Sequence, residues 1–273
     1  MIQESKLPEN WTAVGFSQDL QKGQINIALV EETELVVWRD QNGQAHAWDN
    51  RCPHRGTRLS LGFVRENQLA CPYHGWQFGR DGQCVYTPSI PDTLPPKSLK
   101  ALAHGCMEFF GLIWVAPLDS SLEDFNKLKM DLEESNDFQP IRSIIIERSS
   151  KNIIDGFASI PFPPSKRINA SLCNDSNTFN LGKTEQEFIW EDGEERTITS
   201  YQMNKLQPGF FQIICKSEGS TDILLFALQK IQSQKTAVHL ILVPDNWSTE
   251  PISLKLAYTK WSKIFRHQLE KVS

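Results

Sequence analysis

Two short loops carry the residues of this sequence whose types and spacing are best suited to chemistry. They read 52-CPHRG-56 and 71-CPYHGW-76, so a Cys-x-His pair is separated by sixteen residues from a Cys-x-x-His pair. Two thiolates and two imidazoles make a set of four metal ligands, the number that a structural zinc ion takes. Zinc fingers usually group their cysteines and their histidines, whereas each pair here mixes the two. The flanking prolines and glycines suit two rigid loops that close on a larger metal cluster.

The two loops resemble those of the Rieske family, in which two cysteines hold one iron of a [2Fe–2S] cluster and two histidines hold the other. The resemblance implies that Cys52 and Cys71 bind the inner iron, and that His54 and His74 bind the outer, more exposed iron. Neutral imidazoles replace two anionic thiolates, which raises the potential of such a cluster above that of an all-cysteine ferredoxin. A zinc site is the alternative.

The loop sequences favour one branch of this family. Rieske proteins of respiratory complexes carry an extra disulfide-forming cysteine in each loop, and the corresponding positions here are Thr57 and Tyr73. The loops are therefore similar to those of Rieske oxygenases, a likeness that continues through 112-LIWV-115. This resemblance implies a lower-potential cluster that a reductase feeds. It also places Trp76 as packing over the cluster loop.

A second iron site is expected from the resemblance, and its ligands are missing. The family motif reads N-x-x-D-x-x-H, four residues, then H, and it leads to a site with two histidines, one carboxylate and open positions for O₂. In 152-NIIDGFASIPFP-163, Asn152 and Asp155 match, but Ala158 and Pro163 occupy the histidine positions. A shift by one residue gives Ser159 and Pro164. We therefore expect no mononuclear Fe(II) in this chain.

The other histidines offer only a weak substitute. The chain has six, at positions 46, 54, 74, 104, 239 and 267, with none from 105 to 238. His239, His267 and Asp245 could form an atypical iron site, and the family's acidic ligand would fall near 265-FRHQL-269. The family resemblance gives Asp155 a further role. It would relay electrons between a mononuclear-iron histidine and a cluster histidine of the neighbouring subunit in a head-to-tail ring; a helix-surface or capping aspartate is the alternative.

The elements around these residues predict a β domain followed by an α+β domain. Residues 1–118 form the Rieske domain, with short strands separated by turns at Asn42-Gly43 and Asp81-Gly82 and with a proline-rich loop at 88–96. Residues 119–140 form a polar junction, and 141–273 a shortened helix-grip-like domain. Its predicted elements are a strand at 141–147, a helix at 150–158, strands at 186–191, 196–203, 209–216, 222–231 and 235–243, and an amphipathic helix from 252.

Composition excludes several classes of protein. The chain has 273 residues, of which 40% are hydrophobic, and 28 basic against 33 acidic side chains give a net charge of −5. This balance argues against nucleic-acid or anionic-membrane binding. No apolar stretch approaches about 18 residues, and the N-terminus does not resemble a signal peptide. We expect a cytoplasmic protein whose six cysteines are thiols or metal ligands.

The predicted function is electron transfer through a [2Fe–2S] cluster, as the subunit or component of a Rieske-type oxygenase. Within the Rieske oxygenase α-subunit family, the sequence resembles vanillate demethylase and pheophorbide- or chlorophyllide-oxygenase-like proteins. A reductase or ferredoxin would supply electrons, and a homologous subunit in a homo- or hetero-oligomer, such as a head-to-tail trimer, would carry the mononuclear iron. One alternative is a complete oxygenase that hydroxylates or demethylates a hydrophobic or aromatic substrate. Another is a redox-sensing protein that binds a small molecule.

Overall fold

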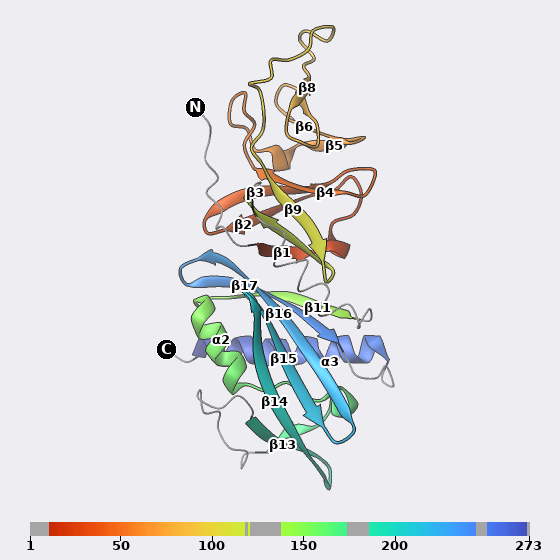
Figure 1. Ribbon diagram of the computed structural model, residues 1–273, viewed down its shortest axis with the longest axis vertical. Helices are drawn as coiled ribbons and strands as arrows, with labels where there is room; N and C mark the ends of the chain where they lie inside the picture. The colour runs from red at the N-terminus through yellow and green to blue at the C-terminus, as the bar shows by residue number, and fades with distance from the viewer. Residues whose placement is uncertain (1–10, 118–119, 121–137, 174–185, 244–249, 272–273) are drawn as a thin grey trace. The chain divides into compact units, whose positions relative to one another are not determined.

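The chain folds into two compact units. The computed structural model describes residues 11–117, 120, 138–173, 186–243 and 250–271, and the units are Met1–Ser121 and Leu122–Ser273 (Figure 1). Most of the predicted junction, 119–140, lies outside the described residues, so the predicted domain boundaries remain predictions. The predicted fold class is confirmed, because each unit is built on antiparallel strands and the second adds helices to its sheet.

Unit 1 contains a six-stranded antiparallel sheet. In spatial order its strands are β1 (Thr12–Phe16), β10 (Leu112–Ala116), β9 (Ala103–Phe109), β4 (Ala45–Asp49), β3 (Thr33–Arg39) and β2 (Ile25–Val30), with η1 (Ser17–Asp19) following β1. The turn between β3 and β4 contains Gly43 at φ +95°, a conformation that a residue with a Cβ rarely adopts. The predicted Asn42-Gly43 turn is therefore confirmed.

A second, four-stranded sheet of unit 1 carries one of the two candidate ligand loops. It consists of β5 (Phe63–Arg65), β6 (Gln68–Ala70), β7 (Gln77–Phe78) and β8 (Cys84–Tyr86), and η2 (Leu59–Leu61) precedes it. Loop 71–76 connects β6 to β7, whereas loop 52–57 lies between β4 and η2. The proline-rich stretch 88–96 contains no strand, as predicted, because proline cannot donate to a ladder.

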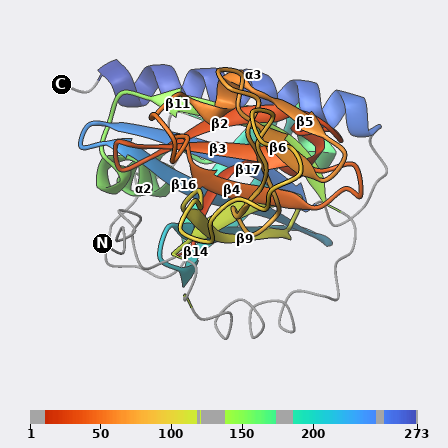
Figure 2. The ribbon, with the colours of Figure 1, turned by 90° about the horizontal axis from the view of Figure 1, so that it is seen from above.

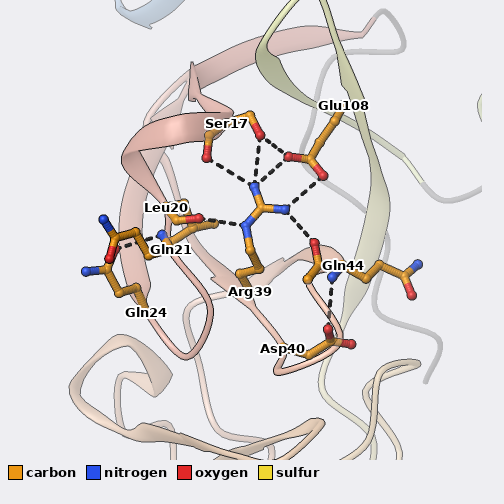
Figure 3. A network of polar contacts seen from close by, with 9 residues as sticks. Ser17, Leu20, Gln21, Gln24, Arg39, Asp40, Gln44 and Glu108 are labelled. Carbon is orange, nitrogen blue, oxygen red and sulfur yellow. Dashed lines mark hydrogen bonds and ion pairs between the residues drawn. The ribbon is translucent and has the colours of Figure 1, made fainter.

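Arg39, at the end of β3, ties together segments of unit 1 that are distant in sequence (Figure 3). Its guanidinium contacts both carboxylate oxygens of Glu108 on β9, at 2.5 and 2.9 Å. It also donates to the carbonyls of Leu20 and Gly43, each at 2.6 Å, and to Ser17 in η1. Only 8% of Arg39 is exposed. A buried guanidinium is stable here because most of its donors have an oxygen acceptor.

In its described residues, unit 2 contains a seven-stranded antiparallel sheet and two α-helices. Its strands, in spatial order, are β11 (Gln139–Ile146), β17 (Lys235–Val243), β16 (Ser220–Gln232), β15 (Phe210–Ser217), β14 (Glu195–Gln207), β13 (Gln186–Asp192) and β12 (Ser171–Leu172). The helices are α2 (Ser150–Ser159) and α3 (Pro251–Lys271), and η3 (Ser165–Arg167) follows α2. The strands and helices predicted for this part of the chain are confirmed.

The long helix α3 lies along one side of the sheet of unit 2 (Figure 1; Figure 2). The five residues predicted to form its apolar face are all buried: Leu254, Tyr258, Trp261, Phe265 and Leu269. The shorter helix α2 approaches α3 closely at Gly156, where an added Cβ would lie 2.3 Å from the Leu269 side chain. This arrangement of a sheet around one long helix agrees with the predicted helix-grip-like domain.

The structure also bears on membrane insertion and on disulfide formation. The helices of the described part of the chain are all too short or too polar to cross a membrane. No disulfide joins any of the six cysteines, all of which the structure describes, and Cys52, Cys71, Cys84 and Cys215 are buried.

Replacement of Arg39 with Met is expected to destabilise unit 1. The change leaves Glu108 and the carbonyls of Leu20 and Gly43 without their donor, a loss of about 3 kcal/mol, and it lowers the melting temperature of the unit by roughly 10 °C. Calorimetric unfolding of the full chain measures this. The control is Arg65→Met, which removes an exposed arginine of β5 and should change stability by less than about 0.5 kcal/mol.

The difference in stability between wild type and Arg39→Met should also depend on pH. Burial raises the pKa of Glu108, but hydrogen bonds from Arg39 and Ser17 outweigh this effect and hold the pKa below its ordinary value of 4.5. A lowered carboxyl pKa stabilises the fold above pH 4.5, and this contribution disappears as the pH falls through the folded-state value. The stability difference between wild type and Arg39→Met should therefore shrink below pH 4.5. A difference independent of pH would contradict the role given to this ion pair.

Candidate metal centre

The first ligand loop is a tight turn closed by its own backbone. The N–H of Cys52 donates to the carbonyl of Thr57 at 2.8 Å, and the N–H of Gly56 donates back to the carbonyl of Cys52 at 2.8 Å. Gly56 has φ +74°, so the loop requires a glycine at this point. The loop thereby holds the side chains of Cys52 and His54 in a fixed relation.

The second loop repeats the same hydrogen-bond pattern. The N–H of Cys71 donates to the carbonyl of Trp76 at 2.9 Å, and the N–H of Gly75 donates to the carbonyl of Cys71 at 3.1 Å. Gly75 also has a positive φ, +69°. In each loop the cysteine is the first residue and the glycine the fifth. Two loops of one geometry therefore present one thiol and one imidazole each.

The two cysteines form the inner side of the site. Cys52 and Cys71 are 4% and 2% exposed and belong to the apolar core that includes Trp38 and Phe78. Burial, with a smaller contribution from the neighbouring Cys71, raises the pKa of the Cys52 thiol to about 11. The backbone N–H groups of the next loop residues oppose this shift because they donate to the Cys52 sulfur. These donors favour a thiolate, the form that binds a metal.

The two histidines form the outer side of the site. The ring centroids of His54 and His74 are 4.8 Å apart. His54 stacks on Trp76, with centroids at 4.0 Å and planes 8° apart, and Tyr73 packs on His74 at 3.9 Å. His74 is exposed, as is Tyr73, with 60% of its surface accessible. Burial and the positive charges of His74 and Arg55 lower the pKa of His54, which favours the neutral imidazole that a metal needs.

The donor set fits a [2Fe–2S] cluster better than a single ion. Within the described residues, no group of three or more His, Cys, Asp or Glu side chains is placed to hold one metal ion. A Rieske cluster requires only two protein ligands on each iron, thiolates on one and imidazoles on the other. The inner pair of sulfurs and the outer pair of imidazoles have this division.

The residues at the motif positions of a mononuclear iron site lie in unit 2. Asn152 is exposed and Asp155 half-buried on α2. At the second histidine position, Pro163 is buried, and its carbonyl accepts a hydrogen bond of 2.6 Å from the Tyr258 hydroxyl. This proline has no side-chain donor for a metal, and its backbone oxygen already has a partner.

The structure describes two of the three candidate substitute iron ligands, His239 and His267. His239 on β17 is 2% exposed, with its Nδ1 2.7 Å from the Ser143 hydroxyl and its Nε2 3.1 Å from the Gln229 side-chain oxygen. Both ring nitrogens are therefore engaged. His267 is exposed on α3, and Asp245 lies outside the described residues. Hydrogen bonds at both ring nitrogens are typical of a structural histidine, because a ligand histidine needs one ring nitrogen for the metal.

Comparison with known proteins agrees with the N-terminal site. Residues 10–102 match the family described as the Rieske [2Fe-2S] domain. The oxidoreductase NdmD of Pseudomonas putida is 38% identical over 112 residues, which are 40% of this chain and 19% of that protein. The chloroplastic chlorophyllide a oxygenase of Chlamydomonas reinhardtii is 38% identical over 126 residues, 45% of this chain and 19% of that protein. The chain thus matches about a fifth of the length of these relatives.

Solved structures with a similar fold also exist. The structure of NdmA from Pseudomonas putida CBB5 with caffeine is similar with a TM-score of 0.72, covering 96% of this chain and 81% of that one at 19% identity. The sequence match and the paired loops define unit 1 as a Rieske domain, which implies a [2Fe–2S] cluster. The chain thus contains a Rieske [2Fe-2S] domain and is similar in this domain to oxygenases and other oxidoreductases that carry one.

Sequence reasoning missed one contact at this site. In the sequence, Tyr73 marks only a position where a disulfide-forming cysteine is lacking. In the structure, its ring packs on the ring of His74. The adjacency of an aromatic residue to a ligand histidine was the available signal. The predicted packing of Trp76 over the cluster loop agrees with its stacking on His54.

Replacement of His74 with Ala is expected to abolish cluster binding, because one iron loses half of its protein ligands. Visible absorption, the paramagnetic signal of the reduced protein and acid-labile sulfide should all be lost. The matched control is Tyr73→Leu, which removes the neighbouring ring but no ligand and should retain the sulfide. Wild-type protein that contains zinc and no labile sulfide would overturn the assignment.

Proposed function

We propose that this chain is the electron-transferring component of a Rieske-type oxygenase, with Cys52, His54, Cys71 and His74 as the ligands of its cluster. A bound [2Fe–2S] cluster supplies one-electron transfer. The protein contributes the two loops that hold it, the apolar core behind the cysteines and an exposed edge at the histidines. The observation that carries the proposal is this asymmetry, since an electron carrier needs one protected side and one accessible side.

We further propose that this chain holds no mononuclear iron of its own. Ala158 and Pro163 replace the two motif histidines, and a carboxylate with water alone is too weak to retain Fe(II). The electron would then pass to iron held by another polypeptide, a homologous subunit in a head-to-tail oligomer. In this arrangement Asp155 is the proposed relay at the subunit interface, since it is half-buried on α2 and retains its motif position.

The electron donor would be a reductase or ferredoxin, and the charge near the cluster favours an acidic one. Residues 51–100 contain seven basic and three acidic side chains, a net charge of +4, whereas the whole chain is at −5. Arg58 and Arg80 pair with Glu34 and Asp40 outside this segment, which leaves an excess of +2. Arg51 and Arg55 flank the first ligands, and both are exposed. Opposite charge speeds the encounter of two proteins, so this local excess would guide an acidic carrier to the histidine edge.

The cytoplasmic location stays a prediction, since one of the matched relatives is chloroplastic by name.

Metal content tests the absence of mononuclear iron. Protein purified without oxygen should contain about two irons and two labile sulfides per chain, as the cluster alone requires. Reduced protein should transfer electrons without oxidising a substrate. A third iron per chain, together with substrate oxidation by this polypeptide and a reductase alone, would restore the alternative of a complete oxygenase with atypical ligands.

The same preparation tests Asp155 once a subunit with intact histidines is supplied. Asp155→Asn should slow substrate turnover by the mixture and leave the cluster spectrum unchanged. Lys151→Gln is the control, because it alters an exposed residue on the same helix that lies outside the motif.

Charge reversal tests the donor. Arg55→Glu should slow reduction of the cluster by an acidic [2Fe–2S] ferredoxin about ten-fold at low ionic strength, and added salt should remove the difference. Stopped-flow absorption measures the rate. Lys216→Glu, at an exposed position on β15 of unit 2, is the control and should have little effect. Equal rates for wild type and Arg55→Glu would contradict this donor, whereas unchanged reduction by dithionite shows that the cluster is intact.

A further inference from the structure

The side chain of Thr87, which directly follows β8 in unit 1, is buried without a hydrogen-bond partner. Only 3% of this residue is exposed, and its hydroxyl oxygen Oγ1 forms no hydrogen bond within the described part of the chain. The next two residues, Pro88 and Ser89, are exposed, so burial is specific to Thr87. Nearly all buried hydroxyls in proteins have a partner, because removing them from water is otherwise unfavourable. An unpaired hydroxyl of this kind points to a bound group.

The pairing of β7 with β8 decides which face of the four-stranded sheet Thr87 occupies. Tyr86 is the cross-strand partner of Gln77. Paired residues of antiparallel strands point to the same face of a sheet, and successive residues alternate between the faces. Thr87 therefore lies on the face opposite to Gln77, which is the face of Trp76 and Phe78. Phe78 belongs to the apolar core that also contains the two ligand cysteines, and Trp76 packs against this core.

The neighbours of Thr87 hold it beside the second ligand loop. A Cβ added to Gly75 of that loop would lie 3.0 Å from Cγ of Pro88, so the chain after Thr87 packs directly on the loop. On the other side, the ladder ends at the pair of Tyr86 and Gln77, and one further step brings Thr87 opposite Trp76, the last residue of the loop. The hydroxyl is thus placed next to the loop that carries one cysteine and one histidine of the cluster site.

A bound cluster would supply the acceptor that this hydroxyl lacks. The sulfurs of an iron–sulfur cluster accept hydrogen bonds, and these bonds are among the features that set its reduction potential. A buried water is the alternative partner, but a stable buried water makes about three hydrogen bonds to polar groups. The adjacent core, which includes Phe78, is apolar and offers few such groups. The surroundings of Thr87 therefore favour the cluster over a water.

We propose that the Thr87 hydroxyl donates a hydrogen bond to a sulfur of the bound cluster and thereby raises its reduction potential. Reduction adds one negative charge to the cluster, and a hydrogen bond is stronger when its acceptor carries more negative charge. The bond therefore stabilises the reduced state more than the oxidised state. This inference rests on the proposed cluster, and it adds a residue that neither ligand loop contains.

Redox titration of the purified holoprotein tests the proposal. Thr87→Val keeps the shape of the side chain and removes the hydroxyl. It should lower the equilibrium constant for reduction about ten-fold, which corresponds to about 59 mV for a one-electron couple. Thr87→Ser keeps the hydroxyl and should retain a potential close to that of wild type. The matched control is Thr93→Val, the same substitution at an exposed position of the proline-rich stretch, which should leave the potential unchanged.

Two further measurements separate a hydrogen bond from a merely structural effect. In reduced protein exchanged into D₂O, pulsed paramagnetic resonance should detect a deuteron coupled to the cluster in wild type and Thr87→Ser that is lost in Thr87→Val. Thr87→Ala, a second variant without a hydroxyl, should lower the potential in the same direction, and it decides the question if the valine variant does not retain its cluster.

The possible failures are distinguishable. An unchanged potential in a Thr87→Val or Thr87→Ala protein that retains its labile sulfide would overturn the role of Thr87 and leave the cluster assignment intact. A shift of the same size in Thr87→Ser would also overturn it, because that variant keeps the donor. Wild-type protein without labile sulfide would instead refute the proposed cluster itself.

Discussion

The closure of two ligand loops by matching backbone hydrogen bonds is the constraint on which unit 1 depends. In each loop the cysteine N–H reaches the sixth residue, and the N–H of a left-handed glycine returns to the cysteine carbonyl. The loops therefore need little from their side chains to keep their shape. The side chains are left to form the site, with buried sulfurs on one side and imidazoles on the other. This gradient of burial underlies the proposed role as an electron carrier.

The rest of unit 1 serves to hold these loops together. One loop leaves the six-stranded sheet after β4, and the other is the hairpin between β6 and β7. The apolar core that contains Trp38, Trp48 and Phe78 also contains Cys52 and Cys71. Strands of both sheets contribute to this core, so their packing positions the two sulfurs. Arg39 fixes the far end of β3 to β9 through Glu108. A substitution at Arg39 would therefore disturb the same sheet from which loop 52–57 emerges.

The interior of unit 2 is closely packed with aromatic rings. Phe157 of α2 stacks on Phe226 of the sheet at 3.8 Å and contacts Phe265 of α3 at 4.3 Å. These rings fill the space between helix and sheet at the close packing typical of protein interiors. The sheet and both described helices thus share one apolar core.

The sequence by itself determined the cluster type and nearly every element of the described residues, and it predicted the ligand set. Cysteine and histidine spacing is local, as are the alternation of the strands and the three- and four-residue steps of α3, so each could be recognised without knowledge of the fold. Tertiary structure alone decided which side of each ligand faces the core. It also decided the packing of Tyr73 on His74 and the contacts of Arg39 with Glu108, 69 residues away. Contacts of this kind are set by the packing of the whole unit, which no local pattern encodes.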